Sequence, residues 1–179
     1  IVNEREKPIA DLDAVPFPYY EALPMEYYVN KKLYHMTPID RMIYVVGSRG
    51  CNYACNFCQR LEKGIRFRSA ENIVEEIKKF KKDYGITYAV FLDELFMVSE
   101  KRITELTEAF INANLNIRYF CTGRLNIVNE NILNMLKRSG CACIDYGIEQ
   151  FDHDALIAMK NRLTEEAIGG GGAPQCLDP

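Results

Sequence analysis

Residues 42–58 read Met-Ile-Tyr-Val-Val-Gly-Ser-Arg-Gly-Cys-Asn-Tyr-Ala-Cys-Asn-Phe-Cys, an apolar run followed by a loop with three cysteines. The apolar run, residues 42–46, is short and rich in β-branched side chains, which predicts a strand buried on both faces. Cys51, Cys55 and Cys58 come next and together span eight residues. The stretch therefore predicts a strand that leads directly into a cysteine loop, with the first helix after the loop.

The same strand pattern recurs along the chain, and an amphipathic helix follows each copy. We expect strands at residues 42–46, 87–92, 116–121 and 141–147. We expect two helices capped by Ser69 and Ser99, a third over residues 129–139 that Gly140 ends, and a fourth over residues 152–160. Strands and helices that alternate in this way are typical of βαβ units around a parallel sheet. The predicted fold is α/β, with four countable βα units.

Composition divides the chain into three parts. Residues 1–40 are rich in Pro and Tyr and predict a connecting arm, because proline interrupts regular structure. Residues 41–165 hold the βα units, and residues 166–179 include four consecutive glycines that predict a flexible tail. We expect the arm to cover the side of the sheet beyond the fourth strand. A first residue other than Met and the glycine tail lead us to expect a piece of a longer chain.

The overall composition excludes several classes of protein. A chain of 179 residues, 48% of them hydrophobic, is large enough for one core. The net charge of −3 gives no indication of nucleic-acid binding, and no apolar run is long enough for a membrane helix. Seven cysteines, three of them in one loop, favour metal binding over disulfides. We therefore expect a cytoplasmic protein, with Cys121, Cys141 and Cys143 as small apolar residues of the core.

The cysteine loop suits an iron–sulfur cluster. Thiolates are the usual ligands of such clusters, and a cubane cluster has about four irons to coordinate. Three cysteines leave one iron without a protein ligand, and an open coordination position is where chemistry occurs. Two alternatives stay open at this point. One is a structural zinc site, which needs a fourth ligand that neither His35 nor His153 supplies at a finger-like spacing. The other is that the three cysteines bind no metal and are residues of the core.

The spacing C-x-x-x-C-x-x-C, with the aromatic Phe57 just before the last cysteine, resembles the defining motif of the radical S-adenosylmethionine superfamily. The resemblance implies a partial (βα) barrel and a 4Fe–4S cluster held by Cys51, Cys55 and Cys58. S-adenosylmethionine would bind the open iron and be cleaved reductively to a 5′-deoxyadenosyl radical, which abstracts hydrogen from a substrate that the sequence does not identify. The implied electron donor is a protein such as flavodoxin or ferredoxin.

Polar residues follow the other predicted strands: Asp93 and Glu94 after the second, Arg124 after the third and Glu149 after the fourth. Strand ends usually meet solvent, so each position alone has an ordinary explanation. Carboxyl ends of parallel strands nevertheless share one edge of the sheet, which is where such folds place their active sites. Residues 91–96 and 147–149 are similar to segments of cobalamin-associated radical enzymes. That resemblance implies carboxylate contacts to the ammonium and ribose groups of S-adenosylmethionine, and a carboxylate or ribose contact for Arg124.

Residues 8–18 are similar to the linker that follows a cobalamin-binding domain in the same subfamily. The resemblance implies a parent protein that uses cobalamin, for methyl transfer or ring chemistry. We expect this chain alone to bind no cobalamin, because no cobalamin-binding fold fits within it. The alternative function is a catalytically inactive fragment or a metal-binding scaffold.

Overall fold

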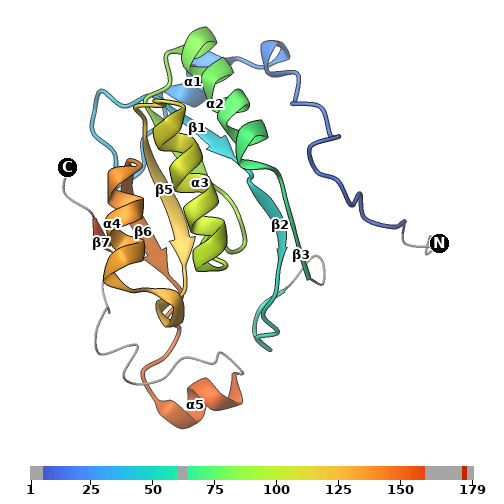
Figure 1. Cartoon of the computed structure of the whole chain (residues 1–179), viewed down its shortest axis with the longest axis vertical. Helices are drawn as coiled ribbons and strands as arrows, with labels where there is room; N and C mark the ends of the chain where they lie inside the picture. The colour runs from blue at the N-terminus through green and yellow to red at the C-terminus, as the bar shows by residue number, and fades with distance from the viewer. Residues whose placement is uncertain (1–5, 60–63, 160–174, 177–179) are drawn as a thin grey trace.

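The computed structural model describes residues 6–59, 64–159 and 175–176. Its central sheet has the strand order β1-β4-β5-β6-β7 (Figure 1). The strands are β1 (Met42–Val45), β4 (Tyr88–Phe91), β5 (Arg118–Gly123), β6 (Cys141–Tyr146) and β7 (Gln175–Cys176). The first four are parallel, and β7 pairs antiparallel with β6. The predicted α/β fold with a four-stranded parallel sheet is confirmed.

Three helices lie together against one face of the sheet (Figure 1). They are α2 (Ala70–Tyr84), α3 (Glu100–Asn112) and α4 (Glu130–Arg138). Their apolar sides bury residues such as Ile77, Phe110 and Leu136 against Val45 and Tyr119 of the strands. Burial of these side chains is the main source of stability for the layer. No helix in the described ranges has both the length and the apolar character that crossing a bilayer requires.

The helices begin where the sequence predicts, because each has a polar N-cap. Ser69, Ser99 and Asn129 accept a hydrogen bond from the backbone N–H three residues further on. Asp152 does the same for the short helix α5 (His153–Ala158). Each cap satisfies one of the backbone donors that a helix start leaves free. After α4, Gly140 takes a φ of 103°, which side chains disfavour.

The third strand begins two residues later than the sequence predicts. Asn114 and Asn116 have φ values of 49° and 45°, in the left-handed region. Asparagine tolerates this conformation better than most residues and uses it in turns. The turn after α3 covers residues 113–114, Asn116 still has a left-handed φ, and β5 therefore starts at Arg118 instead of Asn116.

The cysteine segment contains a β-hairpin that the sequence analysis missed. Strands β2 (Ser48–Cys51) and β3 (Gly64–Phe67) follow β1 and precede α2 in the sequence, and they pair antiparallel with each other. The cysteine loop therefore does not connect β1 directly to α2. Gly50 has a φ of 88°, and a Cβ there would collide with the carbonyl oxygen of Gly64. Glycine is thus required where the two strands approach most closely. Figure 1 shows the hairpin extending away from the main sheet.

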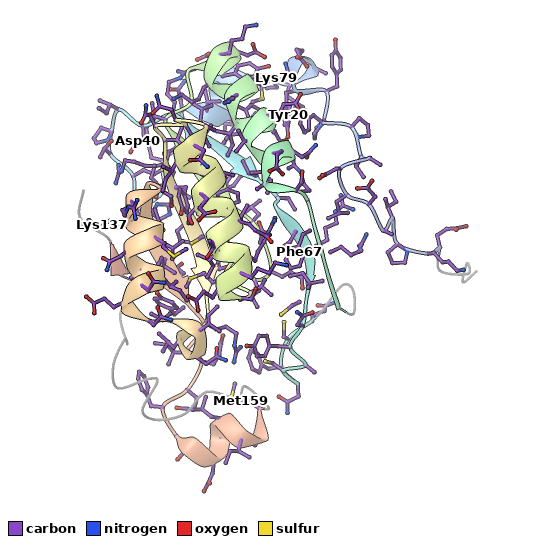
Figure 2. All side chains as sticks on the ribbon, viewed as in Figure 1. Tyr20, Asp40, Phe67, Lys79, Lys137 and Met159 are labelled. Atoms are coloured by element: carbon purple, nitrogen blue, oxygen red, sulfur yellow. The ribbon has the colours of Figure 1, made fainter. Side chains whose placement is uncertain are left out.

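The N-terminal segment, residues 6–40, contains the short helices η1 (Tyr20–Ala22) and α1 (Met25–Val29). Residues 9–21 follow β3 and α2 in the same chain direction. The pairs in contact are Ile9 with Arg66, Asp13 with Ser69, Tyr20 with Glu76 and Glu21 with Lys79. Figure 2 labels Tyr20 and Lys79 at the end of this series. The segment is therefore attached along the outer side of the hairpin and α2.

Further along the same segment, residues 33–36 cover the sheet face that the helices leave free. Leu33 and Met36 pack on the buried side chains of that face, and the His35 ring stacks on Phe120 with 4.6 Å between centroids. Burial lowers the pKa of His35, so its ring stays neutral near pH 7.

We expected residues 1–40 to cover the edge of the sheet at β6, but the structure places another strand there. The backbone partner of β6 is β7, with Ile144 opposite Gln175 and Cys143 opposite Cys176. Unpaired strand edges carry free backbone groups, so any short extended segment within reach is stabilised there. The predicted glycine tail, residues 166–179, otherwise lies outside the described residues.

Candidate functional site

A cavity of about 350 Å³ lies at the carboxyl ends of β4, β5 and β6. The hairpin contributes Cys51, Tyr53, Cys55, Phe57 and Cys58 to its lining, and the strand ends contribute Glu94, Arg124, Asp145 and Glu149. Its size falls within the range of small-molecule sites, about 300–1,000 Å³. Predicted site residues from distant parts of the sequence therefore meet in one place.

The three motif cysteines differ in their surroundings. Cys51 ends β2 and is partly buried, Cys55 is 7% exposed, and Cys58 is exposed. The backbone N–H of Cys58 donates to the carbonyl of Cys55 at 3.3 Å, which forms a tight turn between them. Among the described residues, no three His, Cys, Asp or Glu side chains converge closely enough to hold a single metal ion. All three cysteines nevertheless line the same cavity.

Asp93 and Glu94 have separate environments, although they are neighbours in sequence. The Asp93 carboxylate is 6% exposed and accepts hydrogen bonds from the Gly47 N–H, at 2.9 Å, and from the Ser48 hydroxyl. Burial raises the pKa of Asp93. Glu94 is exposed and lines the cavity. Asp93 thus fastens the junction between β1 and the cysteine hairpin, and Glu94 faces the cavity.

Arg124 follows β5 and lies next to the cysteine loop. Its guanidinium carbon lies 4.0 Å from the centroid of the Tyr53 ring, and its Nη1 lies 3.9 Å from Cys55 Sγ. The side-chain amide of Asn126 donates to the Tyr53 hydroxyl at 3.1 Å. A cation over an aromatic face is attracted by the ring quadrupole. The arginine therefore connects the end of β5 to the loop.

Glu149 follows β6 in a strained conformation. Its φ of 66° lies in the left-handed region, where a glutamate is uncommon. A Cβ on Gly147 would lie 2.8 Å from Glu149 Oε1, so the Glu149 carboxylate lies directly beside Gly147. Backbone strain of this kind persists where surrounding structure enforces it and often occurs at functional sites.

The C-terminal end of helix α5 is hydrogen-bonded to the cysteine loop. Asn56 lies between two of the cysteines, and its backbone and side-chain N–H groups donate to the carbonyls of Met159 and Ala158 at 3.2 and 2.7 Å. Figure 2 labels Met159 at this end of α5. Sequence reasoning missed Tyr53 and Asn56, because nothing in the spacing of the motif distinguishes the residues between its cysteines. It also missed Asn126 and Asp145, which reach the site only through the fold.

Three further cysteines, Cys121, Cys141 and Cys143, are buried in the sheet, as expected. Cys121, Cys141 and Cys143 are at most 3% exposed, and Cys121 Sγ lies 3.9 Å from Cys141 Sγ. Burial raises the pKa of the Cys121 thiol, which favours the neutral form. These residues lie away from the cavity and pack as small apolar side chains.

This geometry defines an α/β protein with a cysteine-rich cavity at the carboxyl edge of its parallel sheet. Residues 45–172 match the family model of the radical SAM superfamily. The chain therefore belongs to the radical SAM superfamily. The match covers most of the chain, and it confirms the resemblance inferred from the cysteine motif.

Individual relatives point in the same direction. The chain is 32% identical over 177 residues to an uncharacterized methyltransferase, PH0819, of Pyrococcus horikoshii, covering 97% of this chain and 35% of that protein. It is 23% identical over 171 residues to an anaerobic magnesium-protoporphyrin IX monomethyl ester cyclase of Rubrivivax gelatinosus, covering 93% of this chain and 30% of that protein. The chain thus spans about a third of the length of these relatives.

Two solved structures share the fold. One is the radical S-adenosylmethionine methyltransferase TsrM of Kitasatospora setae with cobalamin and a 4Fe-4S cluster, at a TM-score of 0.63 and 20% identity, covering 79% of this chain and 27% of that one. The other is the cobalamin-dependent enzyme OxsB with aqua-cobalamin and S-adenosylmethionine, at a TM-score of 0.62 and 20% identity, covering 69% of this chain and 20% of that one.

The residues present fit the cluster that the family implies. Three cysteines line the cavity, and thiolates are the ligands that iron–sulfur clusters use. The same cavity is also lined by Glu94, Arg124 and Glu149, a polar set suited to a charged small molecule. The donor set is thus appropriate both for a cluster and for a polar ligand next to it.

Proposed function

We propose that this chain is the cluster-binding and S-adenosylmethionine-binding core of a radical enzyme. The observation that carries the proposal is the shared cavity: the three motif cysteines line it together with Glu94, Arg124 and Glu149. When bound, the cluster supplies one electron that cleaves S-adenosylmethionine to methionine and a 5′-deoxyadenosyl radical. The proposed outcome would be hydrogen abstraction from, or cobalamin-dependent methyl transfer to, a substrate of unknown identity.

The protein side chains bind and orient these groups. Cys51, Cys55 and Cys58 are the proposed cluster ligands, and Phe57 is an apolar wall beside them. Glu94 is the proposed partner of the S-adenosylmethionine ammonium group, since carboxylates accept charge-assisted hydrogen bonds from such donors.

At the other side of the cavity, Glu149 is the proposed contact to the ribose hydroxyls. Asp93 is expected to act only through the hairpin, because its carboxylate is committed to Gly47 and Ser48. We therefore propose Glu94 for the ligand contact after β4 and a structural role for Asp93.

The chemistry of the full-length protein is a broader proposal. The relatives are described as a methyltransferase and a cyclase, and both solved neighbours are cobalamin-associated by their descriptions. We propose that the full-length protein uses cobalamin for related chemistry and that the present chain does not bind it. A flavodoxin-type or ferredoxin-type protein is the proposed electron donor, because the cluster needs a one-electron reductant of low potential.

Anaerobic reconstitution tests the proposal. We expect about four irons per chain, with visible absorbance that disappears when the three motif cysteines are replaced by Ala. S-adenosylmethionine should change the electron paramagnetic resonance spectrum of the reduced cluster. Glu94→Gln and Glu149→Gln should weaken that effect without loss of iron, whereas Glu108→Gln, an exposed acid on α3, should not.

Two results would contradict the proposal. A triple cysteine variant with a full complement of iron would disprove the ligand assignment. A reconstituted cluster whose spectrum does not respond to S-adenosylmethionine would favour a metal-binding scaffold without turnover.

A further inference from the structure

The side chain of Arg124 is directed at a cysteine sulfur. Its Nη1 lies 3.9 Å from Sγ of Cys55, which is the most buried of the three motif cysteines. A guanidinium at this distance from a sulfur donates a weak N–H···S hydrogen bond, and the bond strengthens when the sulfur carries the charge of a thiolate.

The surrounding residues hold the arginine in this position. The Tyr53 ring lies under the guanidinium at 4.0 Å, and Asn126 fixes the Tyr53 hydroxyl. The chain before Arg124 packs closely on Met97, because a Cβ added at Gly123 would collide with the Met97 sulfur. A stacked guanidinium keeps its planar orientation, which a lysine ammonium would not do.

We propose that Arg124 acts through Cys55 to make the bound cluster easier to reduce. The inference rests on the proposed function and adds a role for one residue of that site. Hydrogen bonds to cluster sulfurs and nearby positive charge both raise a cluster's reduction potential, because they stabilise the state that has gained an electron. Arg124 supplies both effects from a fixed position, and Tyr53 provides the platform that keeps the guanidinium there.

This role differs from direct contact with S-adenosylmethionine, which the family resemblance implies for Arg124. The geometry favours the sulfur, since the guanidinium is stacked on one loop residue and directed at another. The two roles separate experimentally. An effect through Cys55 exists before S-adenosylmethionine is added, whereas a ligand contact has an effect only afterwards.

The decisive experiment is an anaerobic redox titration of the reconstituted chain, followed by the electron paramagnetic resonance signal of the reduced cluster without S-adenosylmethionine. In Arg124→Gln, we expect one-electron reduction to become at least tenfold less favourable, a midpoint lower by about 59 mV, with iron content unchanged. Arg118→Gln is the matched control. Arg118 begins the same strand and lies over the Tyr88 ring at 5.4 Å, but it does not line the cysteine cavity.

A second variant keeps the test decisive if Arg124→Gln fails to retain iron. Tyr53→Leu removes the platform and leaves the arginine, so the midpoint should shift in the same direction by a smaller amount. Tyr53→Phe retains the ring face and should stay close to wild type.

An unchanged midpoint in a fully loaded Arg124→Gln protein would overturn the inference, and so would an unchanged Tyr53→Leu. Weaker S-adenosylmethionine binding with an unchanged midpoint would assign Arg124 to the ligand instead. Absence of a cluster from the wild-type chain would overturn the proposed function itself, which iron analysis detects before any titration.

Discussion

Replacing Asp93 by Ala should destabilise the protein and release the cysteine hairpin from the sheet. The carboxylate is the acceptor for two buried donors, the backbone N–H of Gly47 and the hydroxyl of Ser48. Each buried donor left without an acceptor costs about 1–3 kcal/mol. Part of this loss is offset, because the substitution also ends the burial of a carboxylate. We expect the free energy of unfolding to fall by about 2–4 kcal/mol.

Urea denaturation of the wild type and a small set of variants measures this effect. Ser48→Ala should cost about 1 kcal/mol alone, and it should cost less in the Asp93→Ala background, where its hydroxyl has already lost its partner. Glu94→Ala is the matched control and should stay within about 0.5 kcal/mol of wild type, since this side chain is exposed. A stability of Asp93→Ala equal to that of the control would refute the reasoning.

The same carboxyl group gives a pH dependence whose sign follows from burial. Burial raises the pKa of folded Asp93 above its usual value of 3.8, so the folded state binds this proton more tightly than the unfolded state does. The stability that the proton confers is present below the unfolded pKa and is lost as pH rises through the raised value. Asp93→Asn has no such titration. The stability of the wild type relative to Asp93→Asn should therefore decline as pH increases above about 4, and parallel stability curves would contradict this.

Two further substitutions test the packing around the site. Glu76 is 3% exposed, and its carboxylate lies 2.5 Å from the guanidinium of Arg68. Glu76→Ala leaves that arginine without its carboxylate partner, so the free energy of unfolding should fall by about 2–4 kcal/mol in a urea titration. The matched control is Glu75→Gln at an exposed neighbouring position, which should change the free energy by less than about 0.5 kcal/mol. Gly123→Ala places a methyl group against the sulfur of Met97 and should cost about 1–3 kcal/mol, measured as a lower midpoint of thermal unfolding; an unchanged midpoint would mean that Met97 moves aside freely.

Local signals were sufficient for much of the fold. N-caps depend on one side chain and a backbone N–H three residues away, so Ser69 and Ser99 were identifiable from the sequence alone. Buried parallel strands are continuous apolar runs, which made β1 and β4 recognisable. The position of the cysteine loop at the sheet edge followed from the chain order of these elements.

The hairpin was not predictable from local signals in the same way. Its strands have only four residues each, and glycines at positive φ form the point of closest approach. Its attachment to the sheet depends on Asp93, more than 40 residues away in the sequence. The contacts of Tyr53 with Asn126 and of Asn56 with Ala158 join residues 73 and 102 positions apart. Side-chain pairs of such separation leave no periodic pattern in a single sequence.

The different environments of Asp93 and Glu94, by contrast, are predictable from the alternation of side chains along β4. Side chains alternate between the two faces of a strand. Ala89 and Phe91 face the helices, as their membership of the main core shows. Continuing the alternation past the end of β4 places Asp93 on the helix side and Glu94 on the other, which agrees with their observed environments.

The attachment of residues 9–21 along β3 and α2 has a mechanical consequence. Successive contacts join Ile9 to Arg66 of the hairpin strand β3, and Asp13 and Tyr20 to Ser69 and Glu76 at the start of α2 and within it, so the segment connects the hairpin to the helix. A force applied at Ile9 reaches the strand that returns from the cysteine loop without passing through the central sheet. The link between the N-terminal segment and the cysteine hairpin therefore runs through the contact of Ile9 with Arg66.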